Sequence, residues 1–280
     1  MVDNAQLDRA LSSVLAQITE RPVISVILGS GLGDFAEEFV ERKSISTSAI
    51  PHYPVSTVQG HEGTLVFGRI RSDGRTSLPV LVFKGRVHYY ETVDLDAVVF
   101  PIHLAAALGV RYLLVTNAAG GVGRSLAAGD LMLINDFVNF TFLYPQVNTQ
   151  QRRGNPFAQQ EYREFLDEEL QAIFRLAATE MGVVLREGVY CWLKGPTYET
   201  KAEVEMFRRL GVDALGMSTV PEILAANELG IRVAGISLIS NLAAGMSAEK
   251  LSHEEVTETG KRVRLTFSRL LKEVLLRIKP

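Results

Sequence analysis

The 280-residue sequence predicts an α/β fold: a single domain, residues 1–280, with a mixed, mainly parallel central β-sheet flanked by helices on both faces. Apolar runs typical of strands alternate along the chain with segments whose apolar residues recur at helical spacing. No proline-rich linker, charge block or internal repeat divides the sequence. One α/β domain of this length can bury a large core.

The N-terminal half begins this alternation. Apolar residues at helical spacing predict an opening amphipathic helix, and a glycine-rich turn follows the first strand. The expected elements are a helix at 7–18, a strand at 23–28, a turn at 29–33, a strand pair at 65–70 and 80–84 joined through Asp73-Gly74, a helix at 95–108 and a strand at 112–116.

The C-terminal half continues the pattern and ends in a helix. Ser252 and Glu255 have capping-box spacing, which predicts that this helix begins beside them. The expected elements are a helix at 161–181, strands at 189–193, 212–215 and 233–239, and a last helix that presents apolar residues on one face from 256 to 278.

Composition excludes several classes of protein. The net charge of −3 and pI near 6.0 argue against a nucleic-acid surface, which needs clustered basic residues. The single cysteine, Cys191, excludes an internal disulfide framework and fits a reducing compartment. The N-terminus resembles no signal peptide, and the apolar stretch 97–110 is too short to span a bilayer. We therefore expect a cytoplasmic protein with no membrane or nucleic-acid partner.

Three polar segments follow predicted strands of the C-terminal half: 195–200, 216–222 and Ser240-Asn241. They place a carboxylate, a hydroxyl and an amide at the edge where ligands bind in open α/β sheets. An amide beside a carboxylate can recognise a flat heterocycle that carries both donors and acceptors. Taken alone, Glu199 would be a helix N-terminal carboxylate and Asn241 a turn former.

A second group of polar residues suits an anion. Ser30 stands between two glycines at a strand-to-helix turn, where backbone N–H groups can meet phosphate. By itself this turn is an ordinary tight turn; the dinucleotide spacing is not met and no P-loop lysine follows. Arg86 and His88 lie two residues apart and would point the same way on an extended chain. The alternatives are a solvated arginine and a helix-capping histidine.

No metal site is expected. The five histidines show no ligand spacing with one another or with Cys191. The Cys-Trp-Leu context of Cys191 favours a residue buried in a strand over a nucleophile.

Seven segments, in order along the chain from about residue 23 to 255, resemble the trimeric, 6-oxopurine-specific purine nucleoside phosphorylases. The resemblance implies the nucleoside phosphorylase fold. The segments are Val26 to Gly33, Val58 to Gly63, Lys84 to Glu91, Thr116 to Gly121, Gly195 to Thr200 with Gly216 to Glu222, and Ser240-Asn241.

The resemblance also implies a set of ligands. Asn241, Glu199 and His88 match catalytic positions of the family. The implied phosphate ligands are Ser30, His61, Arg86, His88, the backbone N–H of Ala118, and Ser218. The implied nucleoside contacts are Tyr90, Ala118, Tyr198, Glu199, Met217, Asn241 and His253. For His61, an ordinary loop residue is an equally good explanation as a ligand. For His253, an ordinary residue in the first turn of a helix is an equally good one.

The activity that the resemblance implies is phosphorolysis of inosine and guanosine to a free base and (deoxy)ribose 1-phosphate, in purine salvage. Glu199 would accept from N1–H of the purine and Asn241 would bond O6 and N7, so adenosine would fit poorly. Phosphate is then a co-substrate and no cofactor is implied. A methylthioadenosine phosphorylase-like enzyme of altered specificity, a non-catalytic nucleoside-binding protein and a dehydrogenase are the alternatives.

One segment departs from the family pattern. Between Phe137 and Gln160 the family has a longer loop whose aromatic residue reaches into the neighbouring subunit of a homotrimer, and Phe157 is the candidate here. The departure concerns closure of the sugar site and the contact between subunits.

Overall fold

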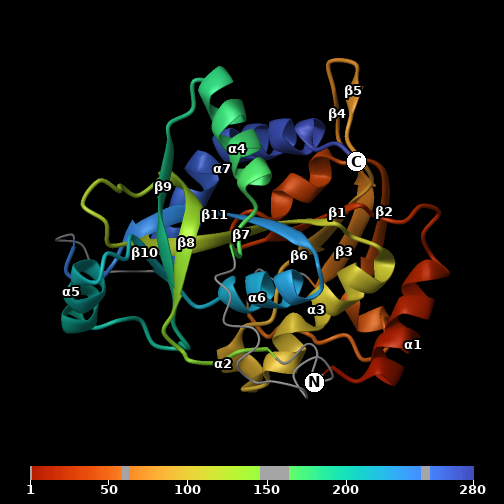
Figure 1. Ribbon diagram of the computed structural model, residues 1–280, viewed down its shortest axis with the longest axis horizontal. Coiled ribbons are helices and arrows are strands. Elements are labelled where there is room, and N and C mark those ends of the chain that lie inside the picture. Colours follow the sequence, from red (N-terminus) through yellow and green to blue (C-terminus); the bar gives the residue numbers. More distant parts are fainter. Residues whose placement is uncertain (1, 59–62, 146–163, 247–252) are drawn as a thin grey trace.

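The computed structural model describes residues 2–58, 63–145, 164–246 and 253–280, without the side chains of 253–262. A nine-stranded mixed sheet runs through the molecule, with helices on both of its faces (Figure 1). The predicted fold class is confirmed.

The elements are best followed in Figure 1. The helices are α1 Asn4–Leu15, α2 Tyr89–Thr92, α3 Leu95–Leu108, α4 Glu168–Glu180, α5 Lys201–Arg209, α6 Val220–Glu228 and α7 His253–Arg277, with 3-10 helices η1 Gly33–Glu38 and η2 Thr47–Ala49. The strands are β1 Ile24–Leu28, β2 Val40–Ser46, β3 Thr64–Arg69, β4 Arg71–Ser72, β5 Arg75–Thr76, β6 Val80–Lys84, β7 Tyr112–Gly121, β8 Leu131–Asn139, β9 Leu185–Trp192, β10 Ala214–Gly216 and β11 Arg232–Leu242.

The sheet closes on itself at one end. Its strand order is β10-β9-β8-β11-β7-β1-β6-β3-β2, and β10 also pairs antiparallel with the far end of β7 through Ala214 and Leu215. The strands β7, β11, β8, β9 and β10 therefore form a ring of hydrogen-bonded neighbours. In β11 the register with β7 shifts between Ile239 and Asn241, and such an irregularity re-aims the side chains beyond it.

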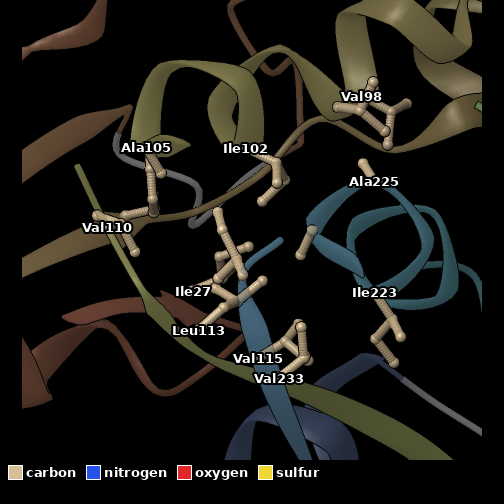
Figure 2. Packing of buried hydrophobic residues seen from close by; sticks show 14 of the residues in the cluster. Ile27, Val98, Ile102, Ala105, Val110, Leu113, Val115, Ile223, Ala225 and Val233 are labelled. Carbon is tan, nitrogen blue, oxygen red and sulfur yellow. The ribbon is translucent and has the colours of Figure 1, made fainter. Parts of the chain in front are cut away.

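Alternation along the strands builds a core on each face of the sheet. In β1, Ile27 faces the layer of α1, α3 and α6, whereas Val26 and Leu28 face the layer of η1, α4 and α7. A strand buried on both faces needs a continuous apolar sequence, which is what 24–28 provides. Figure 2 shows the first layer, where Ile102 of α3 and Ile223 of α6 meet the sheet.

Several sequence predictions need correction. Strands β2 and β8 were not expected, and β7, β9 and β11 are longer than predicted. Asp73-Gly74 forms the turn of the hairpin β4–β5. The paired strands β3 and β6 are therefore connected through this separate two-stranded hairpin, and not through the turn alone. The helix expected at 161–181 begins only at Glu168, because the Asp167 side chain accepts from the backbone N–H of Leu170 at 2.9 Å and caps it.

Within the described part of the chain, none of the helices combines the length and the apolar composition that crossing a bilayer requires.

Candidate active site

A pocket of about 170 Å³ opens where several strands of the sheet end. Its walls come from segments that follow or end β1, β6, β7, β9, β10 and β11. It brings together every predicted site residue whose side chain the structure describes: Ser30, Arg86, His88, Tyr90, Ala118, Tyr198, Glu199, Met217, Ser218 and Asn241.

Three predicted residues are not tested by this geometry. His61 and Phe157 lie outside the described residues. His253 is the first residue of α7, and its side chain lies outside the description.

The first turn of the pocket is built by Gly29. Its N–H donates to the Thr116 hydroxyl at 3.0 Å. A Cβ at this position would lie 2.8 Å from Cα of Asn117, which is closer than side-chain carbon atoms come to backbone. Only glycine therefore lets the chain just before Ser30 approach β7 this closely.

Arg86 is buried, so the alternative of a solvated surface arginine is wrong. Its Nη1 donates to a carboxylate oxygen of Glu222 at 2.9 Å and to the Thr219 hydroxyl at 3.2 Å. Its Nη2 also donates to the carbonyl of Thr116. The side chains of Arg86 and Glu222 are only 5% and 3% exposed, and a buried ion pair of this kind is stable only with further hydrogen bonds.

His88 both lines the pocket and caps α2, so the predicted cap and the predicted site coincide. The Glu91 carboxylate faces the backbone N–H of His88 at 2.6 Å and its Nδ1 at 3.1 Å. The same carboxylate accepts from the Ser56 hydroxyl at 3.0 Å and from the N–H and hydroxyl of Thr57 at 2.6 and 3.0 Å. Although burial alone would raise it, these bonds from His88 and Thr57 hold the pKa of Glu91 well below its usual value.

Tyr90, Met217 and Gly195 form a tight cluster on another wall. The rings of His88 and Tyr90 stack with centroids 5.0 Å apart. A Cβ at Gly195, whose φ is +67°, would lie 2.5 Å from Sδ of Met217 and 2.8 Å from the ring of Tyr90. Tyr198, in contrast, is 54% exposed.

The carboxylate of Glu199 and the amide of Asn241 also line the pocket. Burial raises the pKa of Glu199. Asn241 lies inside β11, beyond the register shift, rather than after the strand as predicted. Its Oδ1 accepts from the Ser240 hydroxyl at 2.8 Å and its Nδ2 donates to the carbonyl of Leu242 at 3.0 Å. These two bonds fix the orientation of the amide.

Thr219, which contacts Arg86 and Asn117, has an unusual backbone conformation. Its φ of 78° and ψ of −51° bring the N–H of Val220 to 2.9 Å from the carbonyl of Ser218, as in a γ-turn, which is rare for a residue with a Cβ. The fully buried Thr219 hydroxyl also accepts from Nδ2 of Asn117 at 2.9 Å. Strained backbone of this type persists where the surrounding structure fixes it, and it concentrates at functional sites.

Sequence reasoning missed four residues that support the site: Glu91, Asn117, Thr219 and Glu222. All lie inside segments that the motifs already singled out. One available signal was the acidic Glu222 in the otherwise apolar helix sequence Val-Pro-Glu-Ile-Leu-Ala-Ala, since a lone charge on a buried helix needs a partner. The described residues contain no cluster of acidic, histidine or cysteine side chains that could hold a metal ion.

Comparisons with known proteins agree with the fold. The family model described as the phosphorylase superfamily matches residues 23–276. A protein named purine nucleoside phosphorylase 1 from Geobacillus stearothermophilus is 42% identical over 275 residues, 98% of either chain. Its namesake in Bacillus subtilis (strain 168) is 41% identical over 271 residues, 96% of this chain and 97% of the relative.

A solved structure gives the same result. The crystal structure of a schistosoma purine nucleoside phosphorylase in complex with hypoxanthine has a TM-score of 0.87 and 30% identity, covering 100% of this chain and 99% of that one. The family match and the fold thus define a member of the phosphorylase superfamily. Within it, the chain belongs to the purine nucleoside phosphorylases, which are pentosyltransferases.

Proposed function

We propose that this enzyme cleaves 6-oxopurine nucleosides, inosine and guanosine, with phosphate as co-substrate and without a cofactor. The observation that carries the proposal is that one pocket is lined both by groups suited to an anion and by a carboxylate and an amide. Each of these two sets suits one of the two substrates of a phosphorolysis.

The proposed phosphate ligands are Ser30, Arg86, His88, the backbone N–H of Ala118 and Ser218, all of which line the pocket. A guanidinium, an imidazole and hydroxyl groups supply the donors that phosphate oxygen atoms require. His61 is proposed as a further ligand from the family resemblance alone.

The residues that we propose to bind the base are Glu199 and Asn241. We assign the Glu199 carboxylate to N1–H of the purine and the Asn241 amide to O6 and N7. Adenine has neither N1–H nor O6, so it would leave buried polar groups unpaired, which costs binding free energy. Tyr198 and Met217 would contact the base and Tyr90 the ribose, with His253 proposed at the 5′-hydroxyl.

The reaction needs no protein nucleophile. A phosphate oxygen forms a bond to C1′ of the sugar while the bond from C1′ to the purine nitrogen breaks, and the electron pair of that bond leaves with the base. The products are the free purine and (deoxy)ribose 1-phosphate. Asn241 stabilises the negative charge that develops on the base, so catalysis rests on positioning and electrostatics.

We infer that residues 1–280 act as one domain, in a cytoplasmic homotrimer that serves purine salvage. The exposed aromatic side chains Phe142 and Tyr144 immediately precede the segment that contains Phe157. Exposed aromatic residues are typical of subunit interfaces. In such a trimer Phe157 would reach the neighbouring subunit's pocket.

Release of free base from inosine, guanosine, adenosine and methylthioadenosine, with and without phosphate, tests the proposal. We expect phosphate-dependent release of hypoxanthine and guanine, and little turnover of the two adenine nucleosides. Turnover of the adenine nucleosides alone would contradict the assignment of Glu199 and Asn241. Binding of nucleosides without turnover would favour a non-catalytic binding protein.

A further inference from the structure

Glu222 is a buried carboxylate next to the pocket that the proposed mechanism does not use. It lies in the first turn of α6 and is 2% exposed. Its Oε1 is 2.9 Å from Nη1 of Arg86, whereas its Oε2 is buried and has no hydrogen-bond partner among the described residues. Among the described residues, Arg86 is thus the only cation that forms an ion pair with the Glu222 carboxylate.

The contacts of Arg86 show what such an arrangement can do. Its guanidinium is held by acceptors from three places in the chain: the Thr116 carbonyl in β7, the Thr219 hydroxyl and the Glu222 carboxylate. Three acceptors around a planar, rigid group fix its rotation as well as its position. The orientation of the arginine is therefore set before any ligand arrives.

The carboxylate stands behind the arginine. Arg86 lines the pocket, but Glu222 is not among the described residues that do so. An anion that enters would meet the guanidinium, which lies between it and the carboxylate. The negative charge therefore orients the arginine without repelling the anion at contact distance.

We propose that Glu222 is a positioning residue of the phosphate site, which holds Arg86 from behind in the orientation that binds phosphate. This inference rests on the proposed function, because the proposed function places phosphate in the part of the pocket that Arg86 lines. A merely structural role, in which the carboxylate complements the dipole of α6, is the competing explanation.

Steady-state kinetics of Glu222→Ala and Glu222→Gln separate the two roles. We expect Glu222→Ala to raise the phosphate KM about tenfold or more, as expected for losing one hydrogen bond to a charged group, with the nucleoside KM nearly unchanged. Glu222→Gln keeps an oxygen acceptor near Nη1 and should restore part of the phosphate affinity. Glu228→Gln, at the other end of α6, is the matched control and should leave both KM values unchanged.

Thermal unfolding with inorganic phosphate supplies a readout that needs no turnover. We expect phosphate to raise the melting temperature of the wild-type enzyme and the Glu228 control, and to raise that of the Glu222 variants much less. A lower melting temperature with an unchanged phosphate KM would overturn the inference in favour of the structural role. A lower phosphate KM would overturn it by showing that Glu222 competes with the ligand.

The two proposals fail in different ways. If phosphate neither stabilises the wild-type enzyme nor supports turnover, the assignment of the phosphate site is wrong, and the inference falls with it. If the wild-type enzyme responds to phosphate and both Glu222 variants respond equally, only the role of Glu222 is wrong. Should Glu222→Ala not fold, the isosteric Glu222→Gln still decides the question.

Discussion

Replacing Glu91 by alanine should destabilise the enzyme and weaken phosphate binding together. Five donor groups face this carboxylate: two from His88, one from Ser56 and two from Thr57. The two backbone N–H groups, both at 2.6 Å, are the shortest contacts. A hydrogen bond to a charged group contributes about 1.5–3 kcal/mol, so these two bonds set the size of the expected loss in the free energy of unfolding.

The full sum would overestimate the effect, because Thr57 is exposed and can bind water after the substitution. We therefore expect a loss of about 3 kcal/mol in the free energy of unfolding, which corresponds to a melting temperature lower by about 6–12 °C. His88 would also lose the partner of its Nδ1, so the phosphate KM should rise more than the nucleoside KM.

Differential scanning calorimetry and steady-state kinetics measure both effects. Glu20→Ala serves as the control, since it removes an exposed ion pair with Arg69 and should cost below about 1 kcal/mol. The folded-state pKa of Glu91 is lowered, so its contribution is present above the ordinary value of 4.5 and is lost as the pH falls below it. Glu91→Gln should remove this acid dependence. A Glu91→Ala melting temperature equal to that of the control would refute the reasoning.

Three further outcomes are expected. Asn241→Ala should lower kcat for inosine about 100- to 1,000-fold with little change in melting temperature, measured by hypoxanthine release beside an Asn227→Ala control; an unchanged kcat would contradict its role at the leaving base. Because burial raises the pKa of Glu199 above 4.5, inosine affinity should fall as the pH drops through that raised value, and KM-against-pH profiles should lose this step in Glu199→Gln. Gly29→Ala should cost about 1–3 kcal/mol through the clash with Asn117, and a calorimetric melting temperature equal to wild type would show that the turn can yield.

The fold class follows from local pattern, whereas the closed sheet does not. Apolar runs such as 24–28 and 80–84 identify buried strands because both of their faces are covered. Strand β2 escapes this reasoning because only Ile45 of its residues is buried. The pairing of β10 with β7 joins residues nearly a hundred positions apart, and no periodicity within either segment indicates it.

The candidate site, like the fold, could be predicted from the sequence only in part. Glycine-flanked polar segments at strand ends identified the residues that line the pocket, because their chemistry is unusual at such positions. Glu222 and Glu91 were missed because their importance lies in contacts with Arg86 and His88, which exist only after folding. A sequence shows which side chains can bind a substrate more readily than which side chains hold them in place.

The ring formed by β7, β11, β8, β9 and β10 has a consequence for how the enzyme can be divided. Pocket residues extend along the chain from Gly29 to Ala243, and both long strands β7 and β11 contribute to its walls. Neither the first 120 residues nor the remainder contains a complete wall. Turnover therefore requires β7 and β11 to be assembled with their neighbours, and a fragment that ends before β11 lacks part of the pocket.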